Sequence, residues 1–385
     1  LTASHNPPQY NGIKFNLQDG APAPVTITKD LEKVANTYLA EGKSSTLFKE
    51  KPGKLTKINR IDDFCTQTLH NLSQVLGQMG FNFNKLKICV DAKHGSVANT
   101  WKTFFRKLNN QQFFLLNDLP KHDFGGVIPN PTDLNSLTDL ISQITTQNAT
   151  LGIANDPDGD RHIILDETGT PLAPEETAGI IISFFAKKKL PIHGIYTTLA
   201  SSHLLKKMAQ ELDVNFSETA VGFKYFTNFL KQGKKSKKTA FAIESSGGFS
   251  TSFHTLEKCG FLPALLLLHI IQVSTTPLSE LKKALYETYG VHCFEESELS
   301  YNPQERKRLI TLFDDLDPDQ IKEIIETPLE QINRRDGCKL IFEDDSWILI
   351  RFSGTEPVIR LYAEANSSER AKDLIKKIKK LFFPQ

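Results

Sequence analysis

The sequence predicts a multidomain α/β protein with mixed, largely parallel sheets, followed by a smaller C-terminal α+β domain. The chain has 385 residues, more than one hydrophobic core ordinarily supports. A content of 39% hydrophobic and 24% charged residues is typical of a globular protein. Short apolar runs alternate with amphipathic stretches through most of the chain, as in βαβ units, and the alternation changes in the last part, 291–385.

Composition excludes several function classes. The net charge is +1, so no basic or acidic field indicates nucleic acid or a membrane surface as a partner. The five cysteines are scattered without a CxxC pair, which disfavours a disulfide framework and a zinc site, and we expect a cytoplasmic protein. The most apolar run, 261–273, is too short to cross a bilayer and is typical of a buried helix. The sequence favours neither a monomer nor a homodimer.

The first fifty residues begin with LTASHNPPQYNGIKF, which combines turn residues with a hydroxyl, an imidazole and an amine. The stretch KDLEKVANTYLAEG then predicts an amphipathic helix that Gly42 ends. A segment rich in Lys and Ser follows, which is typical of a linker. We therefore place a first domain boundary near residue 50.

Residues 51–170 predict an α/β unit. Its expected elements are, in order, strand LKICVDA, helix VANTWKTFFRKL, strand QFFLLND, helix LTDLISQITTQ, strand ATLGIAN and strand HIILDET. The third strand stops at the acidic loop DPDGDR.

Residues 171–290 predict a second α/β unit. Its expected elements are helix PEETAGIIISFFAKKK, strand GIYTTLA, helix SSHLLKKMAQEL, helix GFKYFTNFLKQG, strand KTAFAIESS, the buried helix at 261–273 and helix PLSELKKALYETYG. Residues 291–385 predict the α+β domain, with helix QERKRLITLFDDL, a hairpin in GCKLIFEDDSWILIRFSG, strand EPVIRLYAEA and a closing helix SSERAKDLIKKIKKLFF.

The acidic loop is the strongest chemical signal. Asp156, Asp158 and Asp160 alternate at a strand end, so extended backbone points all three carboxylates the same way. Their repulsion calls for a cation, and oxygen-only ligands suit Mg²⁺ or Ca²⁺. With Glu167 they also match an EF-hand loop, but Arg161 stands where that loop needs glycine. A solvated acidic turn is the alternative.

Two further loops carry candidate binding groups. In RFSGTEPVIR, the Arg351 fork, the hydroxyls of Ser353 and Thr355 and the backbone at Gly354 suit a phosphate. In IESSGGF, Glu244 and Ser246 suit sugar hydroxyls. An ordinary hairpin loop and a plain strand-to-helix turn are the alternatives.

In the opening loop, Ser4 suits a nucleophile or phosphoryl carrier, with His5 and Lys14 as proton handlers or anion partners. A turn in which Ser4 and Asn6 bond backbone is equally consistent with these residues. The chain has no GxSxG elbow, so an α/β-hydrolase is not supported.

Four loops, in this order, resemble those of the α-D-phosphohexomutase family, which includes phosphoglucomutases and phosphomannomutases. TASHNPPQYNGIK is similar to the phosphoserine loop, DPDGDR to the metal loop, ESSGGF to the sugar loop and RFSGTEPVIR to the phosphate clamp. The resemblance runs from residue 1 to about residue 365. Residues 1–50 would then be the remnant of a first α/β domain that relatives carry in longer form. The resemblance therefore leads us to expect weak or no activity from this chain.

The resemblance also implies roles for individual residues. Ser4 would carry the transferred phosphoryl group, and Asp156, Asp158 and Asp160 would bind one Mg²⁺ together with a Ser4 phosphoryl oxygen. Three further side chains would act at the transferring phosphoryl: His5, Lys14 and Arg161. The substrate would be held by Lys224, Glu244, Ser246, Arg351, Ser353, Gly354 and Thr355.

The implied activity is interconversion of hexose 1-phosphate and hexose 6-phosphate, with glucose expected first and mannose second. Glucose 1,6-bisphosphate is the expected activator, and hexose phosphates are the expected partners, with no nucleic acid or membrane. Two alternatives remain: a glucose-1,6-bisphosphate synthase, and a non-catalytic sugar-phosphate-binding fragment. A glucosamine-phosphate mutase is less consistent with ESSGG.

Overall fold

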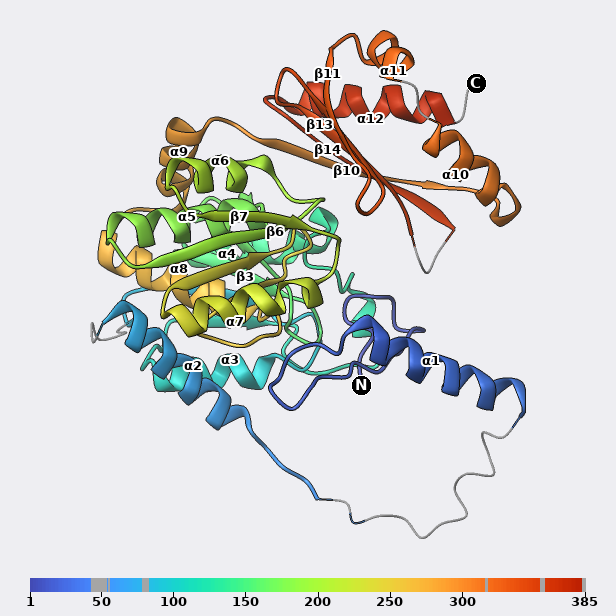
Figure 1. The fold of residues 1–385 in the computed structure, drawn as a ribbon. Coiled ribbons are helices and arrows are strands. Elements are labelled where there is room, and N and C mark those ends of the chain that lie inside the picture. Colours follow the sequence, from blue (N-terminus) through green and yellow to red (C-terminus); the bar gives the residue numbers. More distant parts are fainter. Residues whose placement is uncertain (43–53, 55, 78–82, 316–317, 354–356, 383–385) are drawn as a thin grey trace.

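The computed structural model describes residues 1–42, 54, 56–77, 83–315, 318–353 and 357–382, which form three β-sheets with helices packed against them (Figure 1). The mixed α/β fold class predicted from the sequence is confirmed. Within these residues no single helix is both long and apolar enough to span a membrane, and one pair, Phe261–Ser274 with Leu278–Tyr289, passes that test only jointly and is bent by 93°.

The first sheet has the order β2-β1-β3-β4-β5. Its first three strands are parallel, and β4 and β5 continue it antiparallel. The strands are β1 (Ile88–Asp91), β2 (Phe113–Leu116), β3 (Leu151–Asn155), β4 (His162–Leu165) and β5 (Pro171–Leu172). The helices of this unit are α2 (Ile61–Leu76), α3 (Ala98–Lys107) and α4 (Thr138–Gln147), with short 3₁₀ turns η3 (Phe124–Gly126) and η4 (Leu134–Leu137).

The second sheet has the order β7-β6-β8-β9, with β9 antiparallel to β8. Its strands are β6 (Ile192–Thr198), β7 (Asn215–Thr219), β8 (Thr239–Ile243) and β9 (Phe249–Thr251). Its helices are α5 (Pro174–Lys187), α6 (His203–Glu211), α7 (Thr227–Ser236), α8 (Phe261–Ser274), α9 (Leu278–Tyr289) and the 3₁₀ turn η5 (Phe223–Phe226).

One hydrophobic core serves both of these sheets. Helix α8 is apolar all round, and every residue from Phe261 to Ile271 is buried. The Phe261 ring contacts the Trp101 ring of α3 with centroids 5.2 Å apart, while the same buried cluster includes Phe241 of β8. Because a helix without a polar face must be covered on every side, α8 holds the two units together.

The third sheet is antiparallel throughout, in the order β10-β14-β13-β12-β11. One face carries α12 (Figure 1). The other face packs Trp347 and Leu349 against Leu199 of the second unit. The strands are β10 (Cys293–Ser300), β11 (Leu329–Asn333), β12 (Cys338–Phe342), β13 (Trp347–Phe352) and β14 (Val358–Ala365). The helices are η6 (Pro303–Glu305), α10 (Arg306–Asp314), α11 (Pro318–Ile325) and α12 (Ser368–Phe382).

The helix expected at the N-terminus is present as α1 (Val25–Ala40), and it begins directly after Pro24. None of its side chains is buried. Its apolar positions Ile27, Leu31, Val34 and Tyr38 lie one turn apart and are all exposed.

Several elements were absent from the sequence-based prediction, namely α2, α11, β7, β10 and β11. Strands β7, β10 and β11 are edge strands, and β10 contains three glutamates in its eight residues. An edge strand needs no apolar run, because one of its sides has no neighbouring strand. Helix α2 buries only Cys65, Thr68 and Leu72, which is a weak apolar periodicity.

The shared core predicts that damage to α8 is sensed by α3 of the first unit. Leu267→Ala removes a fully buried side chain and should lower the free energy of unfolding by about 2–5 kcal/mol. We expect urea denaturation of a Trp347→Phe background, followed by Trp101 fluorescence, to show that loss. Leu39→Ala, at an exposed position of α1, is the control. An unchanged Trp101 transition in Leu267→Ala would contradict a common core.

Candidate active site

The three aspartates meet at the end of β3, where the chain turns toward β4. One oxygen from each of Asp156, Asp158 and Asp160 lies within 4.8 Å of the others. Asp156 is fully buried, and its Oδ1 accepts a hydrogen bond from the backbone N–H of Arg161 at 2.9 Å. The loop thus brings together the carboxylates that the sequence placed on one side.

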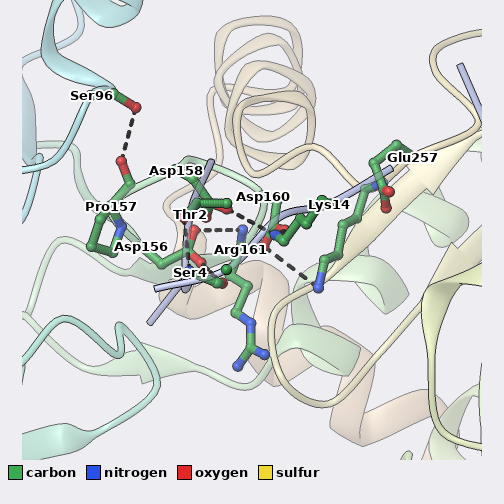
Figure 2. A network of polar contacts seen from close by, with 12 residues as sticks. Thr2, Ser4, Lys14, Ser96, Asp156, Pro157, Asp158, Asp160, Arg161 and Glu257 are labelled. Atoms are coloured by element: carbon green, nitrogen blue, oxygen red, sulfur yellow. Dashed lines mark hydrogen bonds and ion pairs between the residues drawn. The ribbon is translucent and has the colours of Figure 1, made fainter. Parts of the chain in front are cut away.

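The N-terminal segment supplies a hydroxyl and an amine to this cluster (Figure 2). Ser4 has a φ of 54°, in the left-handed region that non-glycine residues rarely adopt, and its Oγ donates to Asp156 Oδ2 at 2.6 Å. Lys14 Nζ donates to Asp158 Oδ2 at 2.8 Å and to Asp160 Oδ2 at 2.5 Å. Residues about 150 positions apart in the sequence therefore form one site.

The electrostatics of the cluster show a shortage of positive charge. Burial, with the charges of Asp160 and Asp158 added to it, raises the pKa of Asp156 to about 8. Burial opposes ionisation of Asp158, but the hydrogen bond and the charge of Lys14, together with hydrogen bonds to Asp156 and Thr2, lower the pKa of that carboxyl. The carboxylates of Asp160 and Asp158 raise the pKa of Lys14, although burial of the amine acts in the opposite direction.

The donor set fits a hard divalent cation. Asp158 Oδ1 and Asp160 Oδ1 are buried and accept no hydrogen bond within the described part of the chain. Buried carboxylate oxygens without a partner are costly, and a bound cation would satisfy them. All of the candidate ligands are oxygens, which Mg²⁺ and Ca²⁺ prefer.

His5 and Arg161 lie beside the cluster. Burial, reinforced by the charges of Arg161 and Lys258, lowers the pKa of His5 to about 3, so its imidazole is neutral at neutral pH. Figure 2 shows the Arg161 side chain extending away from the carboxylates.

The candidate sugar loop is attached directly to the strand that leaves the metal loop. The backbone oxygen of Gly247 accepts from the backbone N–H of His162 at 3.0 Å and from its Nδ1 at 2.7 Å. Glu244 is buried, Ser246 is half-buried, and Lys258 Nζ lies 3.8 Å from Glu244 Oε2 and 3.5 Å from Asp160 Oδ1. One lysine therefore lies between the sugar loop and the metal loop.

The candidate phosphate clamp lies on β13 and β14. Arg351 and Arg360 are directly opposite each other in the antiparallel pairing, so they share a face of the sheet. Arg351 Nε donates to Asp336 Oδ1 at 3.1 Å, and Arg360 forms an ion pair with Glu298 at 3.0 Å. Ser353 is buried at the end of the same segment. Gly354 and Thr355 fall outside the described residues.

Lys224 lies in η5, which begins directly after Gly222, and its Nζ is 5.4 Å from the centre of the Tyr225 ring. It belongs to neither the aspartate cluster nor the Arg351 contacts given above. The structure thus groups Ser4, His5, Lys14 and Arg161 with the aspartates. It places Lys224 in η5, and Arg351 and Ser353 at the end of β13.

Sequence reasoning missed Lys258 and Arg360. Arg360 closes the motif RFSGTEPVIR, and its charge contributes to lowering the pKa of His5, so β14 approaches the Ser4 loop. The strand register that pairs Arg360 with Arg351 could have identified it. Nothing in EKCGF distinguishes Lys258 from an exposed lysine, and only the fold shows its neighbours.

Four family models match the chain in succession. They describe domains of phosphoglucomutase/phosphomannomutase: alpha/beta/alpha domain I at residues 1–41, domain II at 70–169, domain III at 173–289 and the C-terminal domain at 312–381. The order of the matches follows the order of the loops described above.

Relatives agree with these matches. The chain is 29% identical to Phosphoglucomutase-1 of Bos taurus, over 97% of this chain and 74% of that protein. Its fold resembles a putative phosphomannomutase from Thermus thermophilus, with a TM-score of 0.75, 23% identity and coverage of 99% and 77%.

A more distant structure has a similar fold and carries ligands. It is N-acetylphosphoglucosamine mutase of Aspergillus fumigatus in complex with GlcNAc-6P and magnesium, with a TM-score of 0.59, 16% identity and coverage of 99% and 87%. Taken with the four consecutive model matches, these likenesses show that the chain belongs to the phosphoglucomutase/phosphomannomutase family of isomerases, the α-D-phosphohexomutases.

Proposed function

We propose that this phosphohexomutase interconverts hexose 1-phosphate and hexose 6-phosphate through a phosphoserine at Ser4 and a hexose 1,6-bisphosphate. One observation carries the proposal: the Ser4 hydroxyl lies 2.6 Å from Asp156 at the edge of a three-carboxylate cluster. A phosphoryl group on that oxygen would stand beside a cation site, where its charge is neutralised.

Asp156, Asp158 and Asp160 hold Mg²⁺ in this proposal, with an oxygen of the Ser4 phosphoryl group completing the ligands. When bound, Mg²⁺ neutralises charge on the transferring phosphoryl group. The buried Oδ1 atoms of Asp158 and Asp160, which accept no hydrogen bond within the described residues, support this assignment. So does the magnesium complex of the Aspergillus relative.

In the first half-reaction the bond between phosphorus and Ser4 Oγ breaks, and a bond from phosphorus to a sugar hydroxyl oxygen forms. The hydroxyl proton leaves at the same time. In this proposal His5, which lies beside the cluster, accepts it, and Lys14 and Arg161 supply positive charge at the transferring group. The second half-reaction reverses these bonds at the other end of the bisphosphate.

The substrate's far end is held by other loops. Glu244 and Ser246 bind sugar hydroxyls, and Lys224 adds a contact. The distal phosphate is bound by the clamp, which comprises Arg351, Arg360, Ser353, Gly354 and Thr355. Two guanidinium groups opposite each other on one sheet face repel, and an anion bound between them would offset that repulsion. A clamp separate from the metal can release one phosphate and bind the other when the bisphosphate turns over.

Glucose phosphates are the proposed substrate, with mannose phosphates second and glucose 1,6-bisphosphate as the activator that phosphorylates Ser4. The bovine phosphoglucomutase relative supports glucose. A bisphosphate synthase would use the same serine, and a binding fragment would use only the clamp. Assaying glucose, mannose and glucosamine 1-phosphates in parallel, with and without added bisphosphate, separates these functions.

Ser4→Ala should remove the phosphoryl carrier. We expect phosphate transfer from glucose 1,6-bisphosphate to the protein, followed by intact-protein mass spectrometry, to be lost, together with any turnover that the unmodified chain shows. Ser368→Ala is the matched control, because Ser368 Oγ also donates to a carboxylate, Glu295 Oε1, at 2.6 Å. Phosphorylation of Ser4→Ala equal to that of the control would show that Ser4 is not the carrier.

Asp158→Asn should weaken the cation site without emptying it of ligands. We expect Mg²⁺ to raise the Tm of the unmodified chain and to have little effect on the variant, since binding to the native state stabilises it. Asp118→Asn removes a lysine-paired aspartate elsewhere on the same unit, where Lys102 Nζ lies 2.7 Å away, and it should keep the full Mg²⁺ response. An equal Mg²⁺ response in Asp158→Asn would place the cation elsewhere.

A further inference from the structure

The turn between β11 and β12 carries an aspartate that contacts two parts of the proposed substrate site. Asp336 Oδ1 accepts from Arg351 Nε at 3.1 Å, and Asp336 Oδ2 accepts from the backbone N–H of Val221 at 2.8 Å. We infer that Asp336 is a positioning residue, which orients Arg351 for the distal phosphate and ties it to the loop bearing Lys224. This inference rests on the proposed function.

Arg351 needs such a partner for two reasons. Its long side chain has many rotamers, so an unheld guanidinium would lose conformational entropy when it binds a phosphate. It also lies opposite Arg360, whose like charge pushes it away. The bond to Asp336 uses Nε, which leaves the two terminal nitrogens as a fork of the shape that suits a phosphate.

The turn itself is held against the strand that carries Arg351. Gly337, next to Asp336, has a φ of 92°, and a Cβ there would lie 2.4 Å from the backbone oxygen of Ile350. Only glycine allows this close approach. Gly337 therefore packs directly against Ile350, which brings their chain neighbours Asp336 and Arg351 close together.

The second bond of Asp336 reaches the other unit. Val221 precedes Gly222, whose φ is 134°, and the 3₁₀ turn that contains Lys224. Because the two oxygens of a carboxylate are rigidly connected, Arg351 and the Lys224 loop share one anchor. Their separation sets the length of ligand that can bind both.

Neighbouring contacts keep this interface together without Asp336. Arg335 donates to the backbone oxygen of Glu218, and Lys339 Nζ, fully buried, donates to Glu218 Oε1 at 2.8 Å. An Asp336 variant is therefore expected to fold. Its defect should be confined to the orientation of Arg351 and the Lys224 loop.

The test is Asp336→Asn in the full 385-residue chain, with glucose 1,6-bisphosphate binding measured by calorimetry and KM and kcat measured alongside. We expect a Kd and a KM raised about 10-fold and a kcat within about 3-fold, because the clamp holds substrate and transition state alike. Asp344→Asn is the matched control: Asp344 also pairs with an arginine of this domain, Arg370, at 3.1 Å, and it should bind normally.

A double-mutant cycle separates positioning from a general structural effect. If Asp336 acts through Arg351, then Asp336→Asn added to Arg351→Ala should weaken binding by no more than about 2-fold beyond Arg351→Ala alone. Full additivity, or binding by Asp336→Asn equal to that of Asp344→Asn, would overturn the inference while leaving the proposed function in place. Failure of the unmodified chain to bind glucose 1,6-bisphosphate would overturn the proposed function, and the inference with it.

Discussion

Mutual repulsion of three aspartates at the end of β3 is the constraint around which the rest of the site is organised. Carboxylates this close, one of them fully buried, are stable only if positive charge and hydrogen-bond donors surround them. Four groups provide this charge and these donors: the amines of Lys14 and Lys258, the Ser4 hydroxyl and the backbone N–H of Arg161. They come from the N-terminal segment, the second unit and the loop itself, so the same repulsion draws separate parts of the chain together.

The common core gives this arrangement a rigid base. Helix α8 is buried between the first two sheets, and it starts beside the metal loop, where the backbone N–H of Gly260 donates to Gly159 at 2.9 Å. The sugar loop is bonded to His162 on the strand that leaves the metal loop. Cation site and sugar loop therefore move as one body. The third sheet joins them through fewer apolar groups and through an ion pair between the buried Lys339 and the half-buried Glu218.

The first two sheets share a core, whereas the third sheet is joined to them by a smaller contact. This difference suits the two tasks of a mutase. The reacting phosphoryl group needs fixed geometry, which a shared apolar core supplies. The distal phosphate must be released and bound again at the other end, and a clamp on a separate domain permits this. Asp336 lies at the junction between the two tasks, since it contacts both the clamp arginine and a backbone group of the second unit.

Much of the protein was predictable from sequence because it depends on local pattern. Apolar periodicity identified α3, α5, α8, α12 and most central strands, and the alternation of Asp156, Asp158 and Asp160 identified the cation cluster. The polar edge strands β7 and β10 escaped prediction, because hydrogen bonds to one neighbour, rather than burial of apolar side chains, define them.

Only the tertiary structure determined which distant residues meet. Four contacts depend on sheet register and domain packing. They are the contact of Ser4 with Asp156, the position of Lys258 between two loops, the cross-strand position of Arg351 opposite Arg360 and the double contact of Asp336. Residue type specifies what chemistry each side chain can perform. Long-range packing decides which of them share a site, because no local pattern encodes a distance between residues far apart in the chain.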